Sequence, residues 1–504
     1  MINQTLLTKS RYVNGLQCAK WIWLSFNKPE ELPKVDELAQ HRFDEGAKVG
    51  EFAKRLFPDG ISVKSQLNHE ENHKESKELL KKRKPLFEAG FIHKNGECYA
   101  RADILVPVGE DEWAIYEVKS ATQVKEEYIL DVSFQKYCYE SAGLKISQCY
   151  IIHINNEYVR QGEIEVNELF VTAPIHEEVD EQLDNIESKI KKLFEIISLK
   201  NCPEFKNGED CHKDELNVHH NDKFWKDNSE CDILDLYYGG KNAIELFNAG
   251  ILSIKDMDEN HFTTRPQKKQ QKIQHKVTKS GEHHADKEEL AKFIDGLKYP
   301  LYFMDFETYA TAIPLYDNLK PYQPIPFQFS VHVIEKFGAK PKHYSFIASG
   351  DKDPRLNFTQ ELRSVIGEYG TVLVYYQSFE KGRLKEIAEF FPEENEWINS
   401  VIKRFVDLYE PFRNFAYYHP SQKGSASLKK VLPALTGKGY DDLEIGDGMT
   451  ASIAYLFITH GAYNGDKPKT QEIKEVRANL EQYCGQDTEG MIWILQKLEN
   501  LIKK

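Results

Sequence analysis

Apolar residues predominate along two neighbouring segments in the N-terminal part of the chain, 97–107 and 113–118, with a few charged residues between them. Both segments are rich in apolar residues and an acidic stretch, 109–112, separates them, which predicts a pair of strands joined by a turn. A helical pattern over 125–142 and another strand pattern over 147–155 follow. This order predicts an α/β unit. Further helices are expected over 12–24, 37–56 and 176–199, and a further strand near 90–93.

A second apolar block begins at Leu297 and predicts a second α/β unit. Its first strand, 301–307, is apolar and ends in acidic residues. Three strands followed by alternating helix and strand predict a mixed sheet flanked by helices. Further strands are expected over 327–334, 342–346 and 372–376, and helices over 356–368, 382–391 and 473–501.

The region between the two blocks has a different composition. Segment 265–284 carries many Lys, Arg and Gln residues and few apolar ones, which predicts a linker or a basic arm. A small helical pair is expected just before it. The pattern therefore divides the chain into an N-terminal domain, 1–235, a helical hairpin with a basic linker, 236–290, and a C-terminal domain, 291–504.

Composition predicts a protein with no membrane partner. The 504-residue chain has no run of 18 apolar residues, and its N-terminus lacks the apolar core of a signal peptide, so a cytoplasmic location is expected. The net charge of −14 argues against a surface that coats nucleic acid broadly, but it allows an enzyme with a local basic channel. Eight cysteines in a reducing compartment indicate metal ligands or buried thiols rather than disulfides.

Asp103, Glu117 and Lys119 lie at one end of the first predicted strand pair. Side chains alternate across a strand, so Glu117 and Lys119 share one face. Two carboxylates with an ammonium group can hold a divalent cation and orient a water molecule for attack on phosphate. The alternative is a set of solvated cross-strand charges. Arg101, two residues before Asp103, and Gln135-x-x-x-Tyr139 on the following helix favour a site.

The ordered motifs Ala100-Arg101-Ala102-Asp103, Glu117-Val118-Lys119 and Gln135-x-x-x-Tyr139 resemble those of RecB-type nucleases of the PD-(D/E)xK superfamily, with Cas4-like proteins as the nearest group. The resemblance covers about residues 1–235 and implies a restriction-endonuclease-like fold. It also implies that Asp103 and Glu117 bind Mg²⁺ or Mn²⁺ and that His41 is a further metal ligand. Lys119 would position the water molecule. Gln135 and Tyr139 would support the site or the DNA.

Four cysteines extend this resemblance, because Cas4-like nucleases hold an iron–sulfur cluster with one cysteine before the nuclease core and three after it. Cys18 matches the first position, and Cys202, Cys211 and Cys231 follow the core. Four thiolates can hold a 4Fe–4S cluster or Zn²⁺. The late cysteines are spaced more widely than the family's compact triplet, so zinc, with His212, His219 or His220 as substitutes, and no metal at all both remain open. The other cysteines, Cys98, Cys138, Cys149 and Cys484, are expected to be core thiols.

Asp305-Phe-Glu307 closes the first strand of the second block and places two carboxylates on one face, which suits a two-metal site. Far downstream, Tyr483 and Asp487 lie one helical turn apart. These motifs resemble a DnaQ-like (DEDD, tyrosine variant) 3′–5′ exonuclease on a ribonuclease H-like fold. The family's second motif supplies Asp, whereas this chain offers Glu380 at the end of a strand, with Asp407 as a substitute. A retained fold with lost chemistry is the alternative.

The two halves together resemble the DUF2779 family, which joins a Cas4/RecB-like nuclease to a ribonuclease H-like domain. The resemblance rests on Tyr302-Phe-Met-Asp-Phe-Glu-Thr, Lys423-Gly-Ser-Ala-Ser-Leu-Lys and Tyr483-Cys-Gly-Gln-Asp-Thr. It implies a metal-dependent nuclease with two catalytic centres, acting on DNA, single-stranded DNA above all, with RNA open as a second substrate. The other hypothesis is a nucleic-acid-binding adaptor in which one or both sites are inactive.

Overall fold

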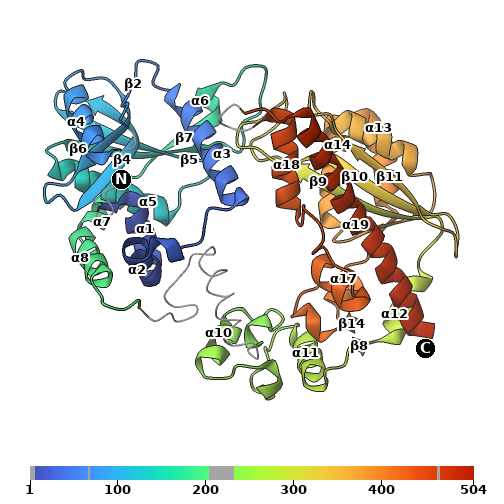
Figure 1. Ribbon diagram of the computed structural model, residues 1–504. Coiled ribbons are helices and arrows are strands. Elements are labelled where there is room, and N and C mark those ends of the chain that lie inside the picture. Colours follow the sequence, from blue (N-terminus) through green and yellow to red (C-terminus); the bar gives the residue numbers. More distant parts are fainter. Residues whose placement is uncertain (1–5, 66–67, 204–231, 462–465, 504) are drawn as a thin grey trace. The chain divides into compact units, whose positions relative to one another are not determined.

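The chain folds into two units, shown in a computed structural model that describes residues 6–65, 68–203, 232–461 and 466–503 (Figure 1). Unit 1 comprises residues 1–224 together with the segment 311–323, and unit 2 comprises residues 225–310 and 324–504. The segment 311–323 therefore packs with the N-terminal unit, although it lies within the C-terminal part of the sequence. The mixed α/β class expected from the alternation of elements is confirmed in both units.

Unit 1 is built on a seven-stranded mixed sheet in the order β2-β3-β4-β5-β6-β7, with β1 added beside β4. The pairs β3–β4, β4–β5 and β6–β7 are antiparallel, and β5–β6 is parallel. The strands are β1 Leu7–Thr8, β2 Ile61–Ser62, β3 Leu86–Ile92, β4 Cys98–Val108, β5 Glu112–Lys119, β6 Lys145–Ile154 and β7 Phe170–Pro174.

Helices cover both faces of this sheet. Residues of α1, α5, α7 and α8 share one apolar core with alternate positions of β4 and β5, such as Leu105 and Ile115. The intervening positions, such as Ile104, pack with Val49 and Ala53 of α3 on the other face. The helices are α1 Lys9–Gln17, α2 Ala19–Asn27, α3 Glu37–Lys54, α4 His69–Leu80, α5 Glu126–Ser141, α6 Val166–Leu169, α7 His176–Leu183 and α8 Ile186–Ile197.

Unit 2 contains a five-stranded sheet in the order β11-β10-β9-β12-β13. The neighbours β9, β10 and β11 are antiparallel, whereas β12 and β13 run parallel to β9. These strands are β9 Leu301–Tyr309, β10 Ile325–Ile334, β11 Lys342–Ile347, β12 Thr371–Val374 and β13 Phe405–Asp407, and a small separate pair is formed by β8 His284–Ala285 and β14 Tyr417–Tyr418.

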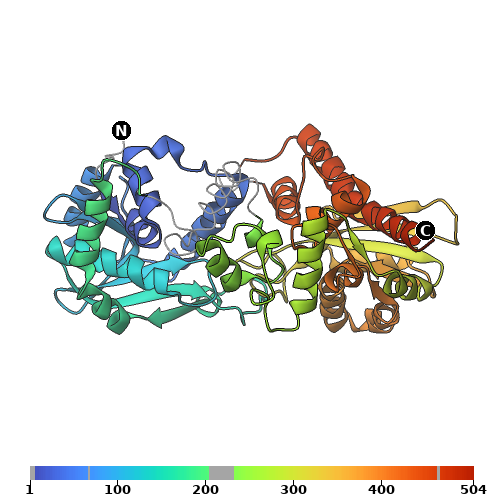
Figure 2. The same cartoon turned by 90° about the horizontal axis from the view of Figure 1, so that it is seen from below.

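The long C-terminal helix α19 lies along one face of this sheet, and α13, α14 and α15 cover the other (Figures 1 and 2). Leu301 and Phe303 of β9 pack toward α19, and Tyr302, Met304 and Phe306 pack toward the opposite helices. The helices are α10 Gly240–Asn248, α11 Lys268–Ser280, α12 Lys287–Asp295, α13 Arg355–Val365, α14 Ser378–Phe390, α15 Asn395–Ile402, α16 Glu410–Arg413, α17 Leu428–Thr436, α18 Gly448–His460 and α19 Thr470–Lys503.

The prediction of a linker or basic arm over 265–284 is wrong, because most of this segment is the helix α11. Its buried side chains include two glutamines, Gln271 and Gln274, whose amide groups form hydrogen bonds with the backbone. Gln271 donates to the Tyr237 carbonyl at 2.9 Å, and Gln274 donates to the Asp235 carbonyl at 2.8 Å. A helix docked by amide–backbone hydrogen bonds has few apolar residues, so hydrophobic patterning does not reveal it.

Two further boundaries differ from expectation. The strand expected to run toward Glu380 ends at Val374, and α14 begins at Ser378, so Glu380 lies in a helix rather than at a strand end. Tyr376 has a positive φ of 70°, which turns the chain from strand into helix. The single helix expected over 176–199 is two helices, α7 and α8.

Among the described residues, no helix is both long enough and apolar enough to cross a membrane.

Candidate functional sites

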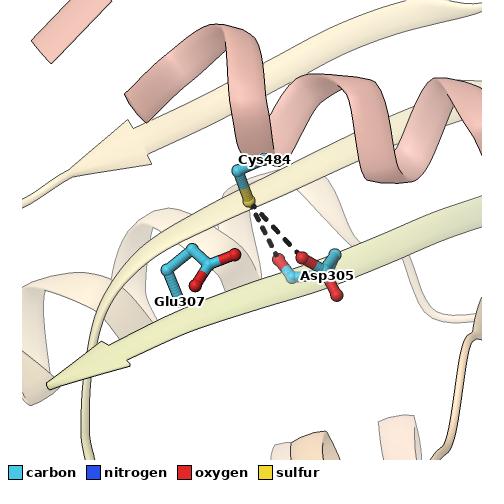
Figure 3. A group of neighbouring side chains, drawn as sticks. All are labelled: Asp305, Glu307 and Cys484. Atoms are coloured by element: carbon cyan, nitrogen blue, oxygen red, sulfur yellow. Dashed lines mark hydrogen bonds between the residues drawn. The ribbon is translucent and has the colours of Figure 1, made fainter. Parts of the chain in front are cut away.

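A cluster of acidic side chains forms in unit 2 where β9 meets α19. Asp305 and Glu307 follow Leu301 and Phe303 on the face of β9 that packs toward α19. Figure 3 shows their carboxylates beneath Cys484, which α19 contributes. The ligand atoms of these three residues lie within 4.8 Å of one another, and no other such group of three occurs among the described residues.

Cys484 is buried as expected, but it lies against carboxylates rather than in an apolar core. Its Sγ is 3.7 Å from Oδ2 and 3.8 Å from the backbone oxygen of Asp305. Burial and the charges of Asp305 and Glu307 raise the pKa of Cys484 well above its usual value, so the thiol stays neutral and donates to Asp305. The expectation of core thiols is confirmed for Cys98, Cys138 and Cys149, which lie in the main core of unit 1.

Asp487 joins this cluster from α19. It is 7% exposed, and its Oδ1 accepts a short hydrogen bond from the hydroxyl of Tyr440. Burial raises the pKa of Asp487 to about 6, although the hydrogen bond from Tyr440 and the ammonium group of Lys429 act to lower it. Tyr483, one turn before Asp487, is also buried, and within the described part of the chain no group hydrogen-bonds its hydroxyl.

Glu380, from the first turn of α14, is the most deeply buried acid of the set at 2% exposure. Its Oε2 has no hydrogen-bond partner among the described residues. Burial raises the pKa of Glu380 to about 8, with a further contribution from Asp407 and opposition from Arg383. A buried carboxylate oxygen without a donor is costly in a folded protein.

The four carboxylates interact electrostatically. Burial is the main cause that raises the pKa of Asp305 well above its usual value, followed by repulsion from Asp487, Glu307 and Glu380. Burial and then Asp487 raise the pKa of Glu307 in the same way. Hard divalent cations such as Mg²⁺ and Mn²⁺ prefer carboxylate oxygens, and a bound cation relieves this kind of repulsion. The donor set therefore fits such an ion.

Asp407, the possible substitute for Glu380, is the last residue of β13. Its carboxylate accepts from the backbone amides of Tyr376 at 2.8 Å, Gln377 at 3.0 Å and Tyr409 at 3.0 Å. These bonds hold the loop between β12 and α14, which carries Glu380 into the acidic cluster. Asp407 therefore holds the loop that leads to Glu380, and its role as a substitute for Glu380 stays a prediction.

The predicted cluster of unit 1 forms between β5 and α5. Lys119 Nζ lies 2.7 Å from Oε1 of Glu117 and 2.7 Å from Oδ2 of Asp131. Gln135 donates to Oε2 of Glu117 at 2.8 Å and to Oδ1 of Asp131 at 3.0 Å. The structure thus brings together Glu117, Lys119 and Gln135 around a buried carboxylate, with Asp131 as an additional member.

A second lysine reaches this cluster from α1. Lys9 Nζ lies 2.7 Å from Oε1 of Glu117. Burial and the charge of Asp103 act to raise the pKa of Glu117, but the ammonium groups of Lys119 and Lys9 outweigh them and the pKa is lowered. Burial opposes the charged form of Lys119, yet Asp131, Glu117 and Asp103 raise its pKa well above its usual value.

The structure also shows where three other predicted site residues of unit 1 lie: Asp103, Tyr139 and His41. Asp103 Oδ2 accepts from the backbone amide of Val118 at 2.7 Å, which ties β4 to β5 beside Glu117. Tyr139 is fully buried, where its hydroxyl accepts from the Ala102 amide at 2.7 Å and donates to the Ala89 carbonyl, so it supports β3 and β4 from beneath. His41 lies half-buried on α3, outside any group of three metal-type ligands in the described residues.

The predicted cysteine site is only partly described. Cys18 is buried and accepts from the Trp21 amide at 3.4 Å, capping the start of α2. Cys202 is half-buried. Cys211 and Cys231 lie outside the described residues, as do the alternative zinc ligands His212, His219 and His220. The iron–sulfur or zinc site stays a prediction.

Five residues of these clusters were not predicted as site residues, and one of them, Cys484, was expected only as a core thiol. Asp131 lies one helical turn before Gln135, a spacing that could have revealed it. Lys429 ends the motif Lys423–Lys429, and its Nζ lies 5.5 Å from the ring centre of Tyr483. Lys9 and Tyr440 have no local signal, because each meets its partner only through the tertiary fold.

Comparison with known proteins supports a relationship over a segment that lies mostly in unit 2. Residues 302–427 match the model of a family described as "Domain of unknown function (DUF2779)". This match confirms the expected resemblance for a segment that contains Asp305, Glu307 and Glu380 and stops before Asp487.

Three curated relatives are similar over part of the chain. "Uncharacterized protein MG366" of Mycoplasma genitalium is 27% identical over 228 residues, which is 41% of this chain and 33% of the relative. "Uncharacterized protein UU173" of Ureaplasma parvum is 28% identical over 231 residues, 41% of this chain and 32% of the relative. The "Uncharacterized protein MG366 homolog" of Mycoplasma pneumoniae is 25% identical over 217 residues. The matched part spans about a third of each relative's length.

Proposed function

We propose that the protein is a divalent-metal-dependent nuclease that hydrolyses phosphodiester bonds of DNA, with single-stranded DNA as the leading substrate. The observation that carries the proposal is the cluster of Asp305, Glu307, Glu380 and Asp487. Its members come from a strand and two helices, their pKa values are raised, and Oε2 of Glu380 has no hydrogen-bond partner among the described residues. Buried, perturbed acids gathered in one place are typical of catalytic sites.

The strand order of unit 2 supports a ribonuclease H-like fold. Three antiparallel strands, β9 to β11, are followed by β12 and β13, which run parallel to β9 on its other side. The first acids lie on β9, and the last lies on the helix that packs on the sheet. This arrangement resembles that of DnaQ-like exonucleases, with Glu380 in place of the usual second-motif aspartate.

The residues of the chain have separable roles in this proposal. Asp305, Glu307, Glu380 and Asp487 would hold one or two Mg²⁺ or Mn²⁺ ions, and such ions when bound polarise phosphate oxygens and lower the pKa of a water ligand. The Tyr483 hydroxyl orients the attacking water, and the ammonium group of Lys429 attracts the phosphate. The neutral Cys484 thiol stabilises the Asp305 carboxylate by donating to it.

Unit 1 would supply the second centre, with a PD-(D/E)xK-like arrangement. Glu117 and Asp103 are the carboxylates for the cation, Lys119 positions the water, and Gln135 holds Glu117 in place. The lysine contacts of Glu117 neutralise it in the absence of other cations. A hard cation would compete with Lys9 and Lys119 for the same oxygens.

The two centres are tested separately. Wild type and the variants Asp305→Asn and Asp103→Asn are incubated with Mn²⁺ and end-labelled single-stranded DNA, duplex DNA or RNA. Each variant should lose roughly 10²–10³-fold of the hydrolysis that depends on its centre. Matched controls are Glu368→Gln in unit 2 and Asp111→Asn in unit 1, both exposed acids outside the clusters. If wild type leaves every substrate intact, the nuclease proposal fails and the adaptor hypothesis stands.

A further inference from the structure

A cavity rich in tyrosine lies in unit 2 beyond the acidic cluster. It has a volume of about 620 Å³, and the loops that follow β12 and β13 line it together with segments 234–238 and 423–428. Five tyrosines border it: Tyr237, Tyr238, Tyr375, Tyr376 and Tyr409. We call it the tyrosine cavity. None of the proposed catalytic roles uses it.

Two of these tyrosines present their rings to solvent. Tyr238 is 68% exposed and Tyr376 is 55% exposed, which is unusual for large aromatic side chains beside a cavity. Among the described residues, no hydrogen bond involves either hydroxyl. Tyr409 lies behind Tyr376 in an edge-to-face contact, with ring centres 5.5 Å apart. The exposed rings are therefore backed by other rings rather than by water.

The backbone holds these rings in a costly conformation. Tyr238, Tyr376 and Lys423 have φ values of 48°, 70° and 50°, in the left-handed region. This region is unfavourable for residues other than glycine, and such positions concentrate at ligand sites. The Asp407 carboxylate fixes the amide of Tyr376 at 2.8 Å, so the strain is supported by a buried charged partner.

Gly424 forms the opposite wall by a close approach of two segments. A Cβ at this position would lie 2.1 Å from the carbonyl oxygen of Asp235, so only glycine fits. Gln274 of α11 holds the same segment by bonding Asp235 and Tyr237. Lys423, exposed at the rim, adds positive charge beside the rings.

The cavity and the acidic cluster share one edge of the sheet. Tyr376 lies in the loop that follows β12 and leads into α14, which carries Glu380, and Tyr409 follows the parallel strand β13. Phe303 on β9 pairs with Leu373 on β12, so Asp305 lies two residues further along β9, and Tyr375 directly follows the end of β12. Neighbouring strands are about 5 Å apart, so the loop that begins at Tyr375 starts beside the strand that carries Asp305. Ligands of open α/β sheets bind at this carboxyl edge.

We propose that the tyrosine cavity binds a base of single-stranded nucleic acid by stacking on Tyr376 and Tyr238, while Lys423 contacts the adjoining phosphate. This inference rests on the proposed function, which supplies the substrate class. It assigns to the tyrosine cavity the part of the nucleic-acid strand that lies next to the cleaved bond. Aromatic rings stack on any base, so this contact favours unpaired strands without reading their sequence. A duplex keeps its bases paired and stacked and does not fit the cavity.

The test measures binding without catalysis. A fluorescein-labelled oligothymidylate of about ten nucleotides is titrated with full-length protein in EDTA, and anisotropy is recorded. Removing one stacking ring should weaken binding about 5- to 100-fold in Tyr376→Ala and in Tyr238→Ala. Tyr376→Phe, which keeps the ring, should bind as wild type does. Tyr369→Ala removes a ring that is 72% exposed elsewhere on unit 2 and is the matched control.

Two further probes separate strand binding from base binding. An abasic oligonucleotide of the same length loses stacking on both rings and should bind at least as weakly as Tyr376→Ala binds the intact strand. Thymidine monophosphate should compete only poorly because it lacks the neighbouring phosphates. Equal binding by wild type, Tyr376→Ala and Tyr238→Ala overturns the inference, as does equal binding of the abasic strand. If wild type hydrolyses DNA but the tyrosine variants bind with unchanged affinity, the binding role of the tyrosine cavity is refuted and the nuclease proposal is not. If binding depends on the rings but wild type shows no hydrolysis, the nuclease proposal is refuted and the binding role is not.

Discussion

Lys9 and Glu117 form an ion pair of 2.7 Å across 108 positions of the sequence. The Glu117 side chain is 2% exposed and that of Lys9 is 22% exposed, so the pair is largely shielded from water. Lys9 is the first helical residue of α1, and Glu117 lies near the end of β5. The pair therefore fixes the N-terminal helix to the strand that carries the predicted site of unit 1.

Replacing Lys9 by Met should destabilise unit 1 by about 1–3 kcal/mol, because a buried carboxylate then loses one of its two cations. Urea unfolding monitored by circular dichroism checks the change. Lys28→Met is the matched control, since Lys28 also pairs with a glutamate at 2.7 Å but on the surface, with both side chains about half exposed. Screening by water makes such pairs weak. Equal midpoints for wild type and Lys9→Met would contradict a stabilising role.

Stability of the metal-free protein should fall as pH rises from about 4.5 to about 8. Burial raises the pKa of Glu380 from 4.5 to about 8, so within this window the native state binds more protons than the unfolded state. Raising the pH then favours unfolding, by an amount on the order of a few kcal/mol. Melting temperatures in EDTA at several pH values measure the effect.

Glu380→Gln isolates this contribution. The variant should lose less stability than wild type over the same pH range, because the amide does not ionise. The uncharged amide also removes the electrostatic repulsion that Glu380 exerts on Asp305 and Glu307. Glu368→Gln, at an exposed position of unit 2, should follow the wild-type curve. Parallel curves for wild type and Glu380→Gln would show that Glu380 is not held protonated.

The two tyrosines near Asp487 should respond differently to removal of their hydroxyls. The hydrogen bond from Tyr440 acts to lower the pKa of Asp487, so Tyr440→Phe should raise that pKa further. If Asp487 must ionise to hold Mn²⁺, the rise in melting temperature that Mn²⁺ produces should require a pH about one unit higher. Thermal shift assays with Mn²⁺ across pH measure this displacement.

Tyr483→Phe is the companion variant. Within the described residues the Tyr483 hydroxyl bonds to no group, so its loss should leave the pH dependence of the Mn²⁺ effect unchanged. Under the proposed function it should still lower the hydrolysis rate, by about 10²-fold or more if the hydroxyl orients water. A displaced pH dependence in Tyr483→Phe and not in Tyr440→Phe would reverse the two roles.

Sequence patterns predicted the parts of the sites that depend on local geometry. Strand alternation placed Asp305 and Glu307 on one side of β9, and helical spacing put Tyr483 and Asp487 one turn apart. The same reasoning found Glu117, Lys119 and Gln135. In each case the relevant residues lie within one element or in neighbouring ones, where the backbone repeat determines which side chains share a face.

The remaining members depend on contacts between distant segments. Tyr440 meets Asp487 across 47 positions, and it lies outside any regular element. The loop conformation at Tyr376 places Glu380 in a helix, and that conformation is stabilised by Asp407 from another strand. Local propensity carries no information about such partners, because the free energy that selects them comes from tertiary packing and from burial of charge.

The buried glutamines of α11 give the last prediction. Gln274 accepts from the Tyr237 amide at 2.7 Å and donates to the Asp235 carbonyl at 2.8 Å, so Gln274→Leu leaves two backbone groups without partners. Each unsatisfied buried group costs about 1–3 kcal/mol, and the variant should lose about 2–5 kcal/mol of unfolding free energy. Lys276→Leu, at an exposed position on the same helix, should change stability by less than about 0.5 kcal/mol. If α11 were a linker as its composition suggests, the two leucine variants would unfold at the same urea concentration.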